Sequence, residues 1–128
     1  MLELLAEFLQ TRGLGTVGVS IFVDFMPAQA SGILLRSNPG GEVIDHELPG
    51  MLMANFMLIA RNDGYEETRL AAQRAIYELQ LGAKHRLQLS TFEFRSILGR
   101  TKPFTFPPAQ GSQREFAANL DVVYIERI

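Results

Sequence analysis

The sequence contains no cysteine, no tryptophan and only two histidines. The absence of cysteine excludes disulfides, a thiol nucleophile and cysteine-ligated zinc. The histidines, His46 and His85, each lie in a polar, turn-like stretch and have no partner residues at metal-ligand spacing. We interpret both as solvated side chains, and the sequence predicts neither a metal ion nor a cofactor.

A strong imbalance of charge is also missing. Lys and Arg number 12 and Asp and Glu number 14, which gives a formal net charge of −2. The basic residues are scattered and the aromatic residues recur at strand spacing, so core packing explains them better than base stacking on a nucleic acid. A mildly acidic chain is not expected to bind the phosphates of a nucleic acid tightly.

Long hydrophobic runs are absent too. The longest apolar stretch, MLMANFMLIA, is too short for a membrane span and is interrupted by Asn55. The first residues, MLELLAEFLQTR, carry Glu3 and Glu7 and lack a basic start, which is typical of an amphipathic helix and not of a signal peptide. We therefore expect no membrane association.

What is present suits a single domain, 1–128. A domain of this size buries roughly two-thirds of its unfolded surface, so its core needs no covalent reinforcement. Hydrophobic residues make up 47% of the chain. That content is sufficient for a globular core and leaves apolar residues for an interface.

Two amphipathic helices are predicted. The first covers the opening residues and ends near Gly13, which suits a helix C-terminus. The second is expected to start at Asp63 as N-cap, with Glu66 completing a capping box, and to stop at Gly82. Their buried faces are Leu2, Leu5, Phe8 and Leu9 in the first helix, and Ala72, Ala75, Ile76 and Leu79 in the second.

Period-two alternation predicts the strands. One strand runs from Val17 to Met26 and forms a hairpin with a short strand at GILLR. The stretch EVIDHELPG is interpreted as a short edge strand. The run Met51–Asn62 is apolar on both faces, which favours a central strand covered on both sides, with a helix as the competing interpretation.

The C-terminal third adds two more strand regions. Within HRLQLSTFEFRSIL the alternation changes phase at Ser90–Thr91, which indicates a bulge or a bend. The elements together predict an α+β fold, with a single antiparallel or mixed sheet of about five to six strands and two helices packed on one face. The final strand places on one face Phe116, Ala118, Leu120, Val122 and Tyr124.

Polar residues do not assemble into a convincing active site. The acidic and histidine residues of Asp45–Glu47 cannot all converge, because neighbours in a strand point to opposite faces. Asp24, Asn55 and Asp121 lie among strand hydrophobes, and the solvent face of a sheet explains them most simply. No glycine-rich phosphate loop and no nucleophile elbow are present. We predict no catalytic residues and do not expect an enzyme.

The segment from Gly99 to Ser112 is unusually apolar for a loop. Its prolines would stiffen it into an arm that reaches roughly 20 Å at ~3.3 Å per residue. The arm either folds back over its own sheet edge or binds a neighbouring subunit. The predicted subunit or partner interface comprises Pro103, Phe104, Phe106, Pro107 and Pro108 of this segment, together with Phe25 and Met26.

Two blocks of sequence resemble a known family. LPGMLMANFMLIARNDGYEETRLAAQRAIYELQ joins a Pro-Gly turn, an apolar strand and an Ala-rich helix, and ILGRTKPFTFPPAQGSQREFAANLDVVYIE joins a strand, a Pro/Phe loop and a closing strand. Together they resemble the tail terminator or minor capsid (neck) proteins of tailed bacteriophages, over most of the chain. The stretch NPGGEVIDHELP is longer and more acidic than the family pattern, which leaves the register of the middle strands open.

The resemblance implies a structural virion protein of the phage neck, assembled in the host cytoplasm. Such proteins form a ring, typically a hexamer, that caps the tail tube and gives the head–tail connector or stopper protein a docking face. DNA passes through the lumen without specific binding. The expected partners are thus further copies of this chain, the tail tube protein and the connector, and the family brings no catalytic residues.

Two alternatives stay open. The first is a head–tail joining or completion protein that binds the connector. The second is a small α+β enzyme or ligand-binding domain. The best of the weak acid–base pairs that the sequence offers for it is Asp24 with His46. That second alternative requires both residues to line one deep pocket.

Overall fold

The structure is a computed structural model that describes residues 1–38, 43–44, 51–100, 103–105 and 113–126. Its helices are α1 (Leu2–Thr11) and α2 (Tyr65–Lys84). Its strands are β1 (Ile21–Val23), β2 (Gly32–Ser37), β3 (Val43–Ile44), β4 (Met51–Asn62), β5 (Gln88–Leu89), β6 (Phe92–Gly99), β7 (Phe104–Thr105) and β8 (Arg114–Glu126).

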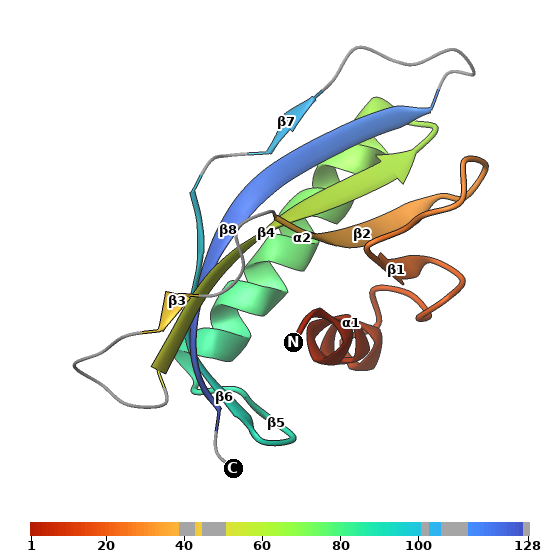
Figure 1. The fold of residues 1–128 in the computed structure, drawn as a ribbon. Helices are drawn as coiled ribbons and strands as arrows, with labels where there is room; N and C mark the ends of the chain where they lie inside the picture. Colours follow the sequence, from red (N-terminus) through yellow and green to blue (C-terminus); the bar gives the residue numbers. More distant parts are fainter. Residues whose placement is uncertain (39–42, 45–50, 101–102, 106–112, 127–128) are drawn as a thin grey trace.

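The strands form one mixed sheet in the order β1-β2-β4-β8-β6-β5, with β3 beside β4 and β7 beside β8 (Figure 1). The long strands β4 and β8 lie at its centre and pair antiparallel along their whole length, from Met51 opposite Ile125 to Asn62 opposite Arg114. Both helices pack on one face of this sheet. The predicted α+β fold, with two helices on one face of a single mixed sheet, is confirmed.

The core lies between that face and the helices. Alternate residues of β4 and β8 point into it, as period two requires. Each large apolar side chain that becomes fully buried there contributes about 1.5–3 kcal/mol to folding. The buried residues of the two central strands on this face are Phe56, Leu58, Ala60, Phe116, Ala118, Leu120, Val122 and Tyr124.

The first helix agrees with its prediction. Leu2, Leu5, Phe8 and Leu9 are all buried, and the helix ends at Thr11. Gly13 follows with a φ of +80°, the left-handed conformation that suits a glycine just beyond a helix.

The predicted ends of the second helix are wrong. Gly64, not Asp63, is the N-cap, and no side chain caps this end. Gly82 does not stop the helix, which continues to Lys84. Gly82 is buried instead, and a Cβ placed there would lie 2.9 Å from Cζ of Phe8 on α1. Close packing between the two helices, rather than termination, therefore explains this glycine.

The first turn of α2 is stabilised by contacts within the helix. Thr68 Oγ1 donates a hydrogen bond to the Gly64 carbonyl at 2.5 Å. Arg69 Nη2 donates to Glu66 Oε2 at 2.6 Å, and this hydrogen bond lowers the pKa of the Glu66 carboxyl and raises the pKa of Arg69. The acidic residues also face the positive end of the helix dipole.

The strand predicted from Val17 to Met26 is reduced to the three residues of β1. The backbone N–H groups of Val19, Ser20 and Ile21 all donate to the Thr16 carbonyl, so residues 16–20 form a turn. The predicted hairpin with GILLR is also wrong, because β1 runs parallel to β2, with Ile21 opposite Ile33. Residues 24–31 carry the chain back to the start of the next strand, which alternation alone does not reveal.

The phase shift at Ser90–Thr91, predicted as a bulge or a bend, is a turn that reverses the chain, and no bulge lies at this point. Strands β5 and β6 form a tight antiparallel hairpin there, and Ser90 has a φ of +55°. The bulge lies further on, between Phe94 and Ser96. The run Met51–Asn62 is a strand with the predicted bounds, so its interpretation as a helix is excluded.

Gly32→Ala is predicted to destabilise the protein by about 3 kcal/mol. Gly32 has a φ of +139°, and an added Cβ would overlap the Ser20 carbonyl oxygen where β2 begins beside β1. Gly13→Ala is the matched control, because Gly13 also has a positive φ but an added Cβ meets nothing within 4 Å. It should cost about 1–2 kcal/mol. Urea unfolding measures both changes, and equal losses would contradict the close approach of β2 to Ser20.

Candidate interaction surface

The face of the sheet opposite the helices is covered only in part. A small apolar cluster formed by Met26, Leu34, Ile59 and Ala117 is buried there. Beyond that cluster Met53 is 40% exposed and Asn55 is exposed as well. The prediction that β4 is covered on both sides therefore holds near Ile59 and fails near Met53.

The segment between β1 and β2 is held over this face by side chains from the central strands. Arg61 Nη1 donates to the Pro27 carbonyl at 3.0 Å, and its Nη2 pairs with Glu115 Oε2 at 3.3 Å. Gln113 Nε2 lies 3.2 Å from Ser31 Oγ. These contacts explain why Met26 is only 7% exposed: it packs against its own chain.

The other predicted interface residues are placed in different ways. Phe25 is 72% exposed. Phe104 is 37% exposed, and β7 pairs antiparallel with β8, which places Phe104 opposite Ala117. Pro103 is half-buried beside it. Within the Gly99–Ser112 segment, Phe104 and Thr105 thus lie along the chain's own sheet, whereas Phe106, Pro107 and Pro108 fall outside the described residues.

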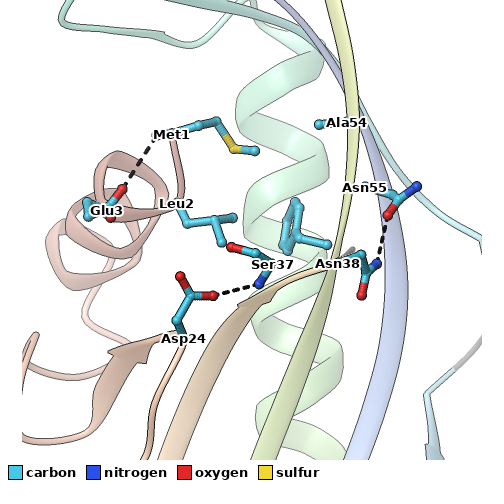
Figure 2. A pocket seen from close by; sticks show the side chains of 9 residues that line it. Met1, Leu2, Glu3, Asp24, Ser37, Asn38, Ala54 and Asn55 are labelled. Atoms are coloured by element: carbon cyan, nitrogen blue, oxygen red, sulfur yellow. Dashed lines mark hydrogen bonds and ion pairs between the residues drawn. The ribbon is translucent and has the colours of Figure 1, made fainter. Parts of the chain in front are cut away.

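The polar residues considered for catalysis have structural partners. Asp24 has a φ of +63°, and its Oδ1 accepts a hydrogen bond from Ser37 N at 2.7 Å (Figure 2). Asn55 Oδ1 accepts from Asn38 Nδ2 at 2.8 Å (Figure 2). Asp121 pairs with Arg100 at 2.9 Å. Each side chain therefore supports local backbone or a neighbouring strand. Asn55 lies opposite Asp121 across β4 and β8, and both line one hollow of about 390 Å³, whereas Asp24 and Asn55 both line the hollow of Figure 2.

Neither histidine is seen in a catalytic arrangement in the part of the chain that the structure describes. His85 is the exposed C-cap residue of α2. His46 and the Asp45–Glu47 stretch lie outside the residues that the structure describes, so a shared pocket with Asp24 is not observed. Within the described ranges no three His, Asp or Glu residues are grouped to hold a metal ion. No helix found there is long and apolar enough to cross a membrane.

One hollow of about 220 Å³ lies between the start of α1, the end of β2 and residues 54–56 of β4 (Figure 2). Leu2, Ala54 and Phe56 supply apolar lining, and Glu3 and Asp24 supply two carboxylates. The Met1 ammonium lies 3.5 Å from Glu3 Oε2. The charged lining of this hollow is therefore two carboxylates and one ammonium group.

A second hollow, of about 350 Å³, lies at the other end of the sheet between α2 and β6. Its charged lining is basic, from Lys84 and Arg95, and Leu98 at its rim is 61% exposed. Tyr77 on α2 is 60% exposed. The sequence pattern does not single out Tyr77 or Leu98. The available signal was that Tyr77 falls outside the Ala72–Leu79 stripe that packs on the sheet.

No protein-family model matches this chain, and no curated protein matches it. Among solved structures it is similar to a chain described as "Virion of native gene transfer agent (GTA) particle". The two chains are 17% identical, the match covers 94% of this chain and 84% of that one, and the TM-score is 0.55. At this identity the likeness shows a shared fold.

Asp24→Ala is predicted to cost about 1–2 kcal/mol of folding free energy, because it removes the acceptor for Ser37 N and places alanine at a positive φ. Asp24→Asn should cost no more than about 0.5 kcal/mol, since asparagine keeps an acceptor oxygen and tolerates this conformation. Urea unfolding distinguishes the two. A loss for Asp24→Asn as large as that for Asp24→Ala would contradict the structural role.

Proposed function

We propose that this chain is a structural protein of a tailed-phage-like virion. In this proposal it forms a ring at the neck that caps the tail tube and presents a docking face to the head–tail connector. The observation that carries the proposal is the fold shared over 94% of the chain with a chain of a gene transfer agent virion. The sequence resemblance to phage tail terminators points to the same class on separate grounds.

The surface supports association rather than chemistry. Asp24, Asn55 and Asp121 are each occupied in a structural contact. Large apolar side chains remain exposed on several elements, among them Phe25, Tyr77 and Leu98. Exposed apolar side chains of this size are what a subunit in an assembly would bury against its neighbours. We accordingly propose a non-enzymatic role.

The proposed partners are further copies of this chain, the tail tube protein and the connector or stopper protein. A hexamer is the proposed ring, with DNA passing through its lumen. The formal net charge of −2 suits a lumen that does not retain DNA, because it offers no excess of cations for the phosphates. Assembly would take place in the host cytoplasm, and the finished ring would belong to the virion.

The proposal is tested by mixing the purified chain with isolated tail tubes and, separately, with DNA-filled heads of the same phage. Electron microscopy should reveal a ring at the open end of each tube, and tubes that already carry a terminator should not bind it. Binding to heads alone would instead support a head–tail joining protein. Binding to neither tubes nor heads would contradict both roles.

Phe104→Ala is predicted to weaken binding to tube ends by about tenfold or more while the protein stays folded. The side chain is 37% exposed, so part of its surface is available to a partner. Thr105→Ala is the control: it removes the hydrogen bond from Thr105 Oγ1 to the Glu115 carbonyl but leaves the aromatic surface of Phe104, so it should bind normally. Unfolding of Phe104→Ala at room temperature, or undiminished binding, would show that Phe104 only packs on its own sheet.

A further inference from the structure

We propose that copies of this chain join edge to edge, with the acidic edge of one copy against the basic edge of the next. The inference rests on the proposed function, which requires a ring, and it assigns the two surfaces that close the ring. The acidic edge comprises Glu3, Glu7, Val19, Asp24 and Phe25, and the basic edge comprises Tyr77, Lys84, Arg95 and Leu98.

The acidic edge lies where α1 passes the turn that precedes β1. Gln10 Oε1 accepts a hydrogen bond from Val17 N at 2.8 Å, so this side of α1 faces the turn. Glu3 and Glu7 precede Gln10 on the same side of the helix, because residues three, four and seven apart lie above one another. Both glutamates are exposed. The helix therefore lines this edge with carboxylates.

Two apolar side chains stand beside those carboxylates. Val19 is 70% exposed in the turn, and Phe25, at 72%, is the most exposed large apolar side chain in the described ranges. Phe25 directly follows Asp24, which lines the hollow of Figure 2 together with Glu3. An aromatic side chain held outward next to acidic groups is suited to insert into an apolar hollow with a basic rim.

The basic edge offers such a hollow. Gln80 and Lys84 of α2 line it together with Arg95 and Leu98 of β6. Tyr77 precedes Gln80 by one helical turn and therefore lies on the same side of α2. Arg95 also pairs with Glu93 at 3.4 Å, which leaves Lys84 as the stronger positive group of this edge.

Strand pairing leaves this edge accessible. β5 pairs with β6 only at Phe92 and Glu93. In the part of the chain that the structure describes, the remainder of β6 has β8 as its strand neighbour on the other side. An accessible edge strand with an exposed leucine is a ready surface for association.

The two edges lie at opposite ends of the sheet, since β1 begins the strand order and β6 lies near its other end (Figure 1). Two different patches on opposite sides of a subunit make a head-to-tail contact, which closes into a ring when the rotation permits. Opposite charges favour this contact, and each edge would repel another copy of itself. The acidic edge of one copy therefore binds the basic edge of a second copy.

The first test uses Phe25→Asp and Leu98→Asp, each of which disables one edge. The unsubstituted chain should form closed oligomers at high concentration by sedimentation velocity and native mass spectrometry. Each variant alone should be monomeric, with an apparent Kd raised about 30-fold or more. An equimolar mixture should give a dimer containing one copy of each variant and nothing larger, because one intact contact remains.

Met53→Asp is the matched control, since Met53 is exposed on the central strand β4 and belongs to neither edge. It should form oligomers like the unsubstituted chain. The inference is overturned if the unsubstituted chain is monomeric at every concentration, if the mixed variants do not pair, or if Met53→Asp alone abolishes association. Circular dichroism of each variant establishes that it is folded.

A second test exchanges the charges. Glu3→Lys with Glu7→Lys makes the acidic edge basic, and Lys84→Glu with Arg95→Glu makes the basic edge acidic. Each double variant should fail to assemble alone, whereas an equimolar mixture should recover closed oligomers in which the two variants alternate. No recovery on mixing would contradict the assigned pairing.

These outcomes are separate from the test of the neck role. Rings at tube ends that persist in the edge variants would overturn the edge assignment and leave the neck role standing. Oligomers that need both edges but never bind tubes or heads would support the edge assignment and contradict the neck role.

Discussion

The antiparallel pairing of β4 with β8 is the constraint on which the other parts of this protein depend. The two strands stay in register from Met51 opposite Ile125 to Asn62 opposite Arg114. Because side chains alternate between faces, a slip of β4 by one residue would turn Phe56 and Leu58 away from the helices. The register therefore decides which face is closed and which stays partly open.

The closed face in turn positions both edges. α2 packs across β4, β8 and β6, and α1 packs beside β1 and against α2 at Gly82. This places the carboxylates of α1 next to β1 and Lys84 of α2 next to β6. The charge asymmetry between the edges is thus a consequence of how the helices lie on the sheet, and it makes the two sides of the subunit chemically different.

Strong local patterns account for what the sequence could predict. The apolar run of β4, the alternation of β8 and the stripe of Leu2, Leu5 and Phe8 each specify an element and its buried face. The parallel pairing of β1 with β2 could not be predicted, since it depends on the path of residues 24–31 and on Gly32 beside Ser20. The role of Gly82 could not be predicted either, because this glycine allows a close contact with a helix that is distant in the sequence.

The candidate surface was predictable only in part, for a related reason. Phe25 was named from the sequence and is exposed, but its neighbour Met26 is buried under the segment tied down by Arg61. Tyr77 and Leu98 become recognisable as parts of one edge only when α2 is seen to pack on β6. Surfaces that join distant segments are set by tertiary packing, which periodicity does not report.

Cryo-electron microscopy of the assembled particle, at a resolution that traces this chain, tests the central claim most directly. We expect a closed ring between the head and the tail tube, in which the β1 end of each copy contacts the β6 end of the next. A particle that lacks this chain, or a ring whose copies meet through the open face of the sheet, would contradict it.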